Sequence, residues 1–301
     1  MREREIFLDQ LRAAATCAVV LLHTVTGVMD HTDMSVYPLE KKAFLVILDL
    51  ICWCVPVFLM ISGYLFLNPQ RKLGMGRMLT KYCRRIVLAL FLFGVPYACM
   101  EQIVLEGSFG PEMVGRAFVM VVRGETWSHM WYLYLILVLY LLTPAIRLLL
   151  QYLPRQVLYG ILAVLFMGSS LLPYLSKLTG WELPGLPDWG IYFFYYISGS
   201  FFTCTGGNLS EDTKGKRGRV LGTAALFLAA AMGCSRLSGG YTLQMAYNYP
   251  FTTVLSFLLF GWGWAGGMHA GQAASFWKRA GELSFAVYLI HPVFLNAAYK
   301  F

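Results

Sequence analysis

Residues 126–146 of this 301-residue chain read TWSHMWYLYLILVLYLLTPAI and contain no Asp, Glu, Lys or Arg. A helix needs about 20 predominantly apolar residues to cross roughly 30 Å of hydrocarbon, so this stretch is long enough to span a membrane. Four further stretches of similar or greater length also lack charged residues: 50–70, 156–176, 189–210 and 237–277. Such segments predict a protein with several membrane spans.

The overall composition excludes a water-soluble fold. Hydrophobic residues make up 58% of the chain and charged residues 13%, whereas soluble domains average about 45–50% and about 25%. Backbone polar groups in lipid must be satisfied within the segment, which favours helices. We therefore predict an all-α fold, a polytopic bundle of about nine to ten transmembrane helices in a single domain, residues 1–301. The nine expected spans are roughly 8–28, 43–67, 86–105, 129–150, 156–175, 189–205, 220–236, 248–268 and 281–299.

Basic residues indicate how this bundle is oriented. If the N-terminus is cytoplasmic, most of the 24 Lys and Arg fall on the cytoplasmic side, including six in residues 71–85 and four in residues 214–219. The positive-inside rule favours that orientation. The net charge of +8 is then a topology signal, and with no nucleic-acid-binding motif in the sequence we expect no nucleic-acid partner.

Residues 113–123 are apolar but too short to span, so they predict an amphipathic helix on the outer surface. The alternative is a tilted tenth span, which would place the basic loop 214–219 outside and is therefore disfavoured.

Ionisable residues within membrane spans are costly and mark functional sites. Our short list of such residues is Arg12, His23, Asp49, Glu101 and His291. The seven cysteines show no metal-ligand spacing with a histidine, so we expect no metal.

Arg12 and His23 form the most informative pair. Eleven residues on a helix correspond to about 1100° of rotation, so the two side chains share one face and lie about 16 Å apart along the axis. This layout suits a substrate whose anionic head binds Arg12 and whose reactive end reaches His23, since histidine exchanges protons near neutral pH. Alternatively, Arg12 extends to the interface and His23 bonds a neighbouring helix. Asp9 is expected to pair with Arg12 across one turn.

Several segments resemble the acyltransferase 3 family, the bacterial envelope O-acyltransferases. The opening segment Leu8–Ala14 is followed by His23, and ten residues separate Arg12 from His23. This pattern resembles the arginine and histidine signature of that family. Four later segments are similar in the same order: 57–65 (VFLMISGYL), 82–85 (YCRR), 129–133 (HMWYL) and 283–292 (LSFAVYLIHP). Together these matches extend over nearly the whole chain.

The resemblance implies transfer of an acyl group, usually acetyl, from cytoplasmic acyl-CoA (acetyl-CoA) to a hydroxyl on an extracytoplasmic sugar. Expected partners are thus the bilayer, the acyl-CoA donor, and a cell-envelope polysaccharide or lipid-linked sugar in a bacterial cytoplasmic membrane. His23 would take part in the transfer as general base, with Arg12 essential nearby. Arg84 and Arg85 are the candidates for binding the CoA phosphates, because arginine binds phosphate bidentately; alternatively, they reflect topology alone.

His129, Trp131 and Glu101 are candidates for contacting the acceptor at the outer surface. Each has a simpler alternative, since aromatic residues anchor helices at the interface and Glu101 would be an interfacial carboxylate. His291 precedes Pro292, which opens the helical hydrogen-bond ladder, and we expect the histidine to satisfy the freed groups. Ser62-Gly63 is expected to serve either a ligand or close helix packing.

Two other functions remain alternatives. A carrier for a small polar solute, similar to the membrane domain fused to serine racemases, would bring Asp49, Glu101 or His291 together near the midplane on broken helices. An inactive scaffold subunit of a polymer export system is disfavoured because Arg12 and His23 are both present. Relatives of this kind are expected to have ten helices, so the domain either lacks a final helix or has one span more than the nine counted.

Overall fold

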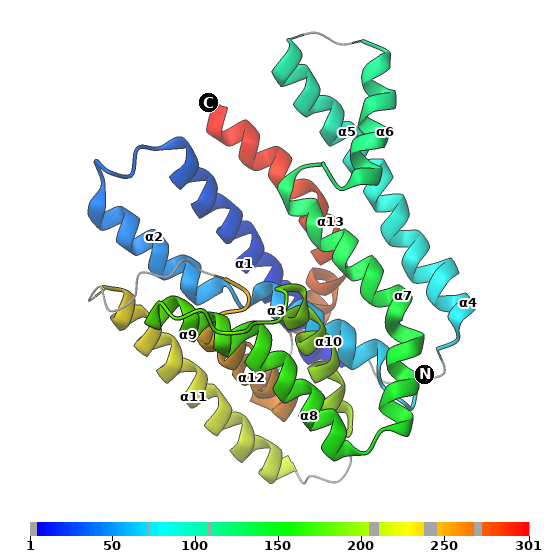
Figure 1. Ribbon diagram of the computed structural model, residues 1–301, viewed down its shortest axis with the longest axis vertical. Coiled ribbons are helices and arrows are strands. Elements are labelled where there is room, and N and C mark those ends of the chain that lie inside the picture. Colours follow the sequence, from blue (N-terminus) through cyan, green and yellow to red (C-terminus); the bar gives the residue numbers. More distant parts are fainter. Residues whose placement is uncertain are drawn as a thin grey trace. The chain divides into compact units, whose positions relative to one another are not determined.

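The computed structural model describes residues 5–71, 73–107, 110–204, 211–237, 246–267 and 273–300. All regular secondary structure within these ranges is helical (Figure 1), which confirms the all-α prediction. The chain divides into two compact units. Unit 1 comprises Met1–Asn68 and Arg155–Phe301, and unit 2 comprises Pro69–Pro154.

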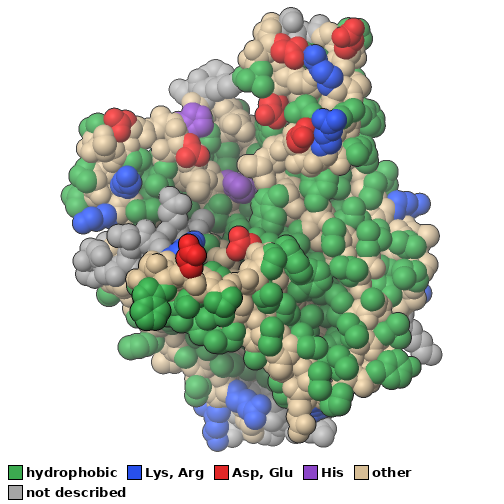
Figure 2. Space-filling model, in the orientation of Figure 1, with side chains coloured by type: hydrophobic (Ala, Val, Ile, Leu, Met, Phe, Trp, Pro, Cys, Tyr) green, Lys and Arg blue, Asp and Glu red, His purple; other side chains and the backbone are tan. Residues whose placement is uncertain are grey.

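The helices are long and apolar enough for a membrane protein. Hydrophobic side chains cover much of the face that Figure 2 shows. Six described segments could each cross a bilayer by length and composition: Ile6–His31, Pro38–Phe66, Met75–Glu106, Ser128–Tyr152, Arg155–Thr179 and Gly215–Arg236. The three other predicted spans also coincide with helices, α10, α12 and α13, and the total of nine spans stays a prediction.

Unit 1 is built around the first and last helices of the chain. Helix α1 packs along α13, α3 packs against α10, and α11 packs against α2 and α12. The helices of this unit are α1 (Ile6–His31), α2 (Pro38–Ile51), α3 (Cys54–Phe66), α8 (Arg155–Phe166), α9 (Leu172–Thr179), α10 (Trp189–Cys204), α11 (Glu211–Leu237), α12 (Pro250–Trp262) and α13 (Ala274–Lys300), with π-helical turns at Met167–Leu171 and Gly263–Gly267.

The predicted span 43–67 is two helices rather than one. Helix α2 ends at Ile51 and α3 begins at Cys54, with a turn at residues 52–53 between them. Pro56 explains the break, because its nitrogen has no hydrogen to bond the carbonyl of Cys52 and its ring clashes with that carbonyl.

Helices α3 and α10 cross at two glycines. A Cβ atom added at Gly63 would overlap the Tyr196 carbonyl oxygen, and one added at Gly199 would overlap the Met60 carbonyl oxygen. Small residues let membrane helices approach this closely. The structure therefore confirms close helix packing at Gly63. The tripeptide Ile61-Ser62-Gly63 recurs in α10 as Ile197-Ser198-Gly199, and the two glycines lie at one crossing.

Replacing Gly63 or Gly199 with alanine is expected to lower the free energy of unfolding by about 1–3 kcal/mol, because the added methyl group meets backbone rather than a mobile side chain. Thermal unfolding in detergent measures this loss. Gly160→Ala is the matched control, since a Cβ atom there meets nothing within 4 Å. Equal melting temperatures for all three variants would contradict the proposed crossing.

Unit 2 contains a helical hairpin and a long helix. The short helix α4 (Met75–Arg77) leads through a π-helical segment, Met78–Cys83, into α5 (Arg84–Glu106). Next come α6 (Glu112–Arg123), a 3₁₀ turn at Ser128–Met130, and α7 (Trp131–Tyr152).

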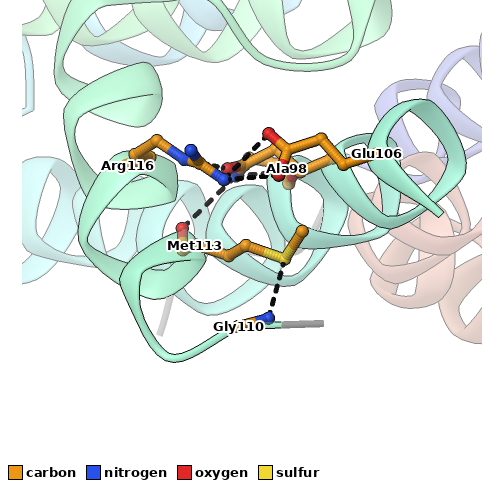
Figure 3. Close-up of polar contacts among 6 residues, drawn as sticks. Ala98, Glu106, Gly110, Met113 and Arg116 are labelled. Carbon is orange, nitrogen blue, oxygen red and sulfur yellow. Dashed lines mark hydrogen bonds and ion pairs between the residues drawn. The ribbon is translucent and has the colours of Figure 1, made fainter. Parts of the chain in front are cut away.

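The expected helix at 113–123 is present as α6, whose 12 residues extend for only about 18 Å, too short to span. It packs against α5 through Met113, Ala117 and Val121, which are buried, while its other face carries exposed apolar side chains. Figure 3 shows the polar contacts of this hairpin, in which Arg116 donates to Gln102 at 2.9 Å and to both carboxylate oxygens of Glu106.

Candidate functional site

Arg12 lies on α1, which is one uninterrupted helix from Ile6 to His31. The predicted shared face of Arg12 and His23 therefore holds. Arg12 Nη1 lies 3.0 Å from Asp9 Oδ1, which confirms the expected ion pair across one turn. The Asp9 side chain is 1% exposed, whereas the Arg12 side chain is 27% exposed. A buried carboxylate thus holds a partly accessible guanidinium.

Helix α13 leaves room for this carboxylate at Gly281. A Cβ atom there would lie 2.7 Å from Asp9 Oδ1 and 3.0 Å from Asp9 Cα. The absence of a side chain at Gly281 lets α13 approach α1 directly beside the Asp9–Arg12 pair. The same interface continues towards His23.

His23 meets His291 at this interface. Their ring centroids lie 5.2 Å apart, with 39° between the ring planes. His291 is 5% exposed, and His23 is half-buried. The sequence marked both histidines as ionisable groups in the membrane but gave no sign that they touch.

Pro292 determines how the His291 ring is held. In a regular helix the nitrogen of residue 292 would donate to the carbonyl of Tyr288, but proline has no such hydrogen. His291 Nδ1 lies 2.9 Å from that carbonyl oxygen and 3.1 Å from the Val287 carbonyl oxygen. This geometry confirms that His291 satisfies backbone groups freed by Pro292.

Tyr299 fixes the part of the same interface that lies beside His23 and Thr24. Its hydroxyl donates to the carbonyl oxygens of Thr24, at 2.9 Å, and His23, at 3.2 Å. Its ring occupies the space that a side chain at Gly27 would fill, and it stacks on His31 with centroids 5.1 Å apart. The contacts advance in step along both chains, so α1 and α13 run parallel.

Arg84 and Arg85 belong to unit 2, at the start of α5. Both are exposed, directly after the π-helical segment. Arg147 Nη2, from the last part of α7, donates to the Arg71 carbonyl oxygen at 2.7 Å and ties the chain before this segment to α7. Residue 72 of the basic loop lies outside the described residues. Phosphate binding by the two arginines stays a prediction.

His129 lies inside an aromatic cluster of unit 2. Tyr97 and Trp127 stack with ring centroids 4.4 Å apart and 2° between the ring planes. The His129 ring makes T-shaped contacts with both, at centroid distances of 5.6 Å to Tyr97 and 6.2 Å to Trp127. His129 is 3% exposed, while Trp131 and Glu101 are half-buried. Contact with an acceptor stays a prediction for all three.

Asp49 is a structural acid in this molecule. Arg236, near the end of α11, bonds it bidentately, with Nε to Oδ2 at 2.7 Å and Nη2 to Oδ1 at 3.0 Å. Both side chains are 6% exposed. Among the described residues, His, Cys, Asp and Glu form no group of three suited to a metal ion. Arg236 is not among the residues predicted from the sequence, although a single arginine after an apolar stretch is a usable signal.

These features define a multi-pass helical membrane protein with an arginine and a pair of histidines along one interhelical face. A model of the acyltransferase 3 family, described as an acyltransferase domain, matches residues 5–301. The chain therefore belongs to this family and is an acyltransferase that uses an acyl donor. Comparisons with curated proteins and with solved structures found no match.

Proposed function

We propose that this enzyme transfers an acetyl group from cytoplasmic acetyl-CoA to a hydroxyl of an extracytoplasmic cell-envelope carbohydrate, in a bacterial cytoplasmic membrane. The observation that carries the proposal is the placement of Arg12 and His23 on one uninterrupted helix of an acyltransferase 3 family member. Arg12 is held by a buried carboxylate and is partly accessible, as a residue that binds an anionic substrate group needs to be.

The proposed reaction has one proton path. His23 takes the proton of the acceptor hydroxyl as the oxygen attacks the thioester carbonyl carbon. The carbon–sulfur bond breaks, the acetyl group remains on the acceptor oxygen, and the departing CoA thiolate takes the proton from His23. Arg12 binds an anionic part of a substrate about 16 Å along the helix from His23.

Three observations agree with the predicted alternation of the spans, in either orientation. Nine alternating spans would make the first and last helices parallel, as α1 and α13 are. Asp49 and Arg236 are both expected near the outer ends of their spans, and they pair. Arg71 and Arg147 are both expected at the cytoplasmic side, and they are joined by a hydrogen bond.

The solute carrier reading finds less support. It requires Asp49, Glu101 or His291 to come together near the midplane. Asp49 is instead engaged by Arg236, and His291 bonds its own helix and contacts His23. The acyltransferase proposal gives a catalytic role to His23, which contacts His291, and gives none to Asp49.

The test is turnover of labelled acetyl-CoA by purified protein in lipid nanodiscs, with lipid-linked sugar and cell-wall polysaccharide fractions as acceptors. Release of CoA together with label on a sugar hydroxyl supports the proposal. CoA release without sugar labelling would show that the acceptor class is wrong. If acetyl-CoA is neither bound nor consumed, acetyl-CoA is not the donor.

Arg84 and Arg85 are expected to contribute to donor binding. Because a charge-assisted hydrogen bond contributes about 1.5–3 kcal/mol, the double variant R84Q/R85Q should raise KM for acetyl-CoA by about ten-fold or more, with kcat much less affected. Arg123→Gln, at the exposed end of α6, is the matched control and should leave KM unchanged. An unchanged KM in the double variant would show that these two charges serve topology alone.

A further inference from the structure

We infer that His291 is a positioning residue for acyl transfer, whose Nε2 atom accepts a hydrogen bond from the His23 ring when His23 takes the proton of the acceptor hydroxyl. This inference rests on the proposed function, in which His23 is the general base. It assigns His291 a role beyond satisfying the backbone around Pro292.

The first step in the argument is the protonation pattern of His291. The two atoms within hydrogen-bonding distance of Nδ1 are the carbonyl oxygens of Val287 and Tyr288. A carbonyl oxygen only accepts, so Nδ1 carries the hydrogen. In a neutral imidazole the other nitrogen, Nε2, then has the lone pair and is an acceptor.

The second step is the position of the two rings. A centroid distance of 5.2 Å puts the rings in direct contact, and His291 is the more buried partner. His23 is half-buried and shares the face of Arg12, so it is the ring that a substrate reaches. His291 lies on α13 behind it, held by its own backbone.

The third step is charge. Two imidazolium ions at this separation in a low-dielectric interior repel each other strongly, so the pair accommodates one proton charge at a time. The backbone bonds keep the hydrogen on Nδ1, so Nε2 is the nitrogen of His291 that can accept from a cationic His23. A fixed acceptor beside a general base orients its ring and stabilises the imidazolium that forms, as the third member of a catalytic triad does.

The rest of the interface supports a fixed geometry. Tyr299 bonds the carbonyl oxygens of His23 and Thr24, and Gly281 lets α13 lie against Asp9. The backbone on which His23 sits is thus bonded directly to the helix that carries His291. No transfer of electrons or additional reactant is needed, since the proton moves from the hydroxyl to His23 and then to the CoA thiolate.

Two substitutions separate the structural and functional roles of His291. Asparagine places an amide donor near the position of Nδ1 and can still bond the Tyr288 carbonyl, but it has nothing at the position of Nε2. Glutamine places its amide near the position of Nε2 and restores an acceptor there. His291→Asn should therefore lower kcat by about 10²-fold, as expected for a displaced catalytic group, with KM for acetyl-CoA unchanged. His291→Gln should retain clearly more activity.

The experiment measures acetyl-CoA turnover by wild type, His291→Asn, His291→Gln and His23→Ala in nanodiscs. It also measures the rate at which diethyl pyrocarbonate modifies His23, with exposed His31 as the internal reference, because this rate does not depend on acyl transfer. The inference predicts slower His23 modification in the asparagine variant than in the glutamine variant.

The role of His291 would be overturned if His23 were modified at the same rate in wild type, His291→Asn and His291→Gln. It would also be overturned if His291→Asn had a higher kcat than His291→Gln. If wild type does not turn over acetyl-CoA but the modification rates differ as expected, the histidine pair stands and the proposed donor is wrong. Thermal unfolding of each variant shows whether a loss of activity reflects a loss of folded protein.

Discussion

Replacing His23 with alanine is expected to lower kcat for acetyl transfer by about 10²–10⁴-fold, the usual contribution of a general base. The acceptor hydroxyl would then have to lose its proton without a positioned base. Binding of acetyl-CoA should change little, because the donor's charged groups are expected to bind arginines rather than His23. Turnover in nanodiscs gives kcat, and isothermal titration calorimetry gives the donor affinity.

His31→Ala is the matched control for this prediction. His31 lies at the end of the same helix, is exposed, and bonds the Gly27 carbonyl with its own Nδ1 at 2.8 Å. Its loss should leave kcat near the wild-type value. If His23→Ala retained more than about a tenth of wild-type kcat, a loss smaller than a general base normally contributes, His23 would not be the base, and the signature spacing would have another purpose.

The local part of this site could be predicted from the sequence. The shared face of Arg12 and His23 follows from helical periodicity, and the Asp9–Arg12 pair follows from a spacing of three residues. The bond from His291 to the Tyr288 carbonyl follows from Pro292 alone. Each of these features depends only on one helix and its geometry.

The partners between helices could not be predicted in this way. The contact of His23 with His291 depends on α1 and α13 being neighbours, which periodicity does not reveal. The same holds for Tyr299, whose hydroxyl bonds backbone on a helix 275 residues earlier in the chain. The sequence could mark His23 and His291 one by one, because the cost of an ionisable group in the membrane is a property of each residue.

Helix boundaries show a second limit. Hydropathy joined residues 43–67 into one span, because it registers apolar character and not the missing hydrogen of Pro56. The amphipathic pattern of α6 identified a helix with one apolar face but could not distinguish lipid from α5 as the surface that this face covers. The first of these limits concerns the local backbone, and only the second depends on packing between neighbouring helices.

The largest expected effect on stability is at the buried pair of Asp49 and Arg236. Removing either partner alone, as Asp49→Leu or Arg236→Met, should lower the free energy of unfolding by about 3–5 kcal/mol, because the remaining charge is buried without compensation. The pair joins α2 to α11 across 187 positions of sequence, so the loss should appear as a cooperative shift of the whole unfolding transition of unit 1. Denaturant titration in detergent micelles measures it.

The double variant D49L/R236M distinguishes the cost of an unpaired charge from the worth of the pair. Replacing both partners with apolar residues removes the buried charges together, so the double variant should regain most of the stability that each single variant loses. The exposed pair of Glu106 and Arg116, at 46% and 51% side-chain exposure, is the matched control. Breaking that pair should cost about 1 kcal/mol or less, because solvent screens it. If the single and double variants of Asp49 and Arg236 had equal stability, an unpaired buried charge would not explain the loss. The loss in free energy of unfolding would then come from lost packing volume.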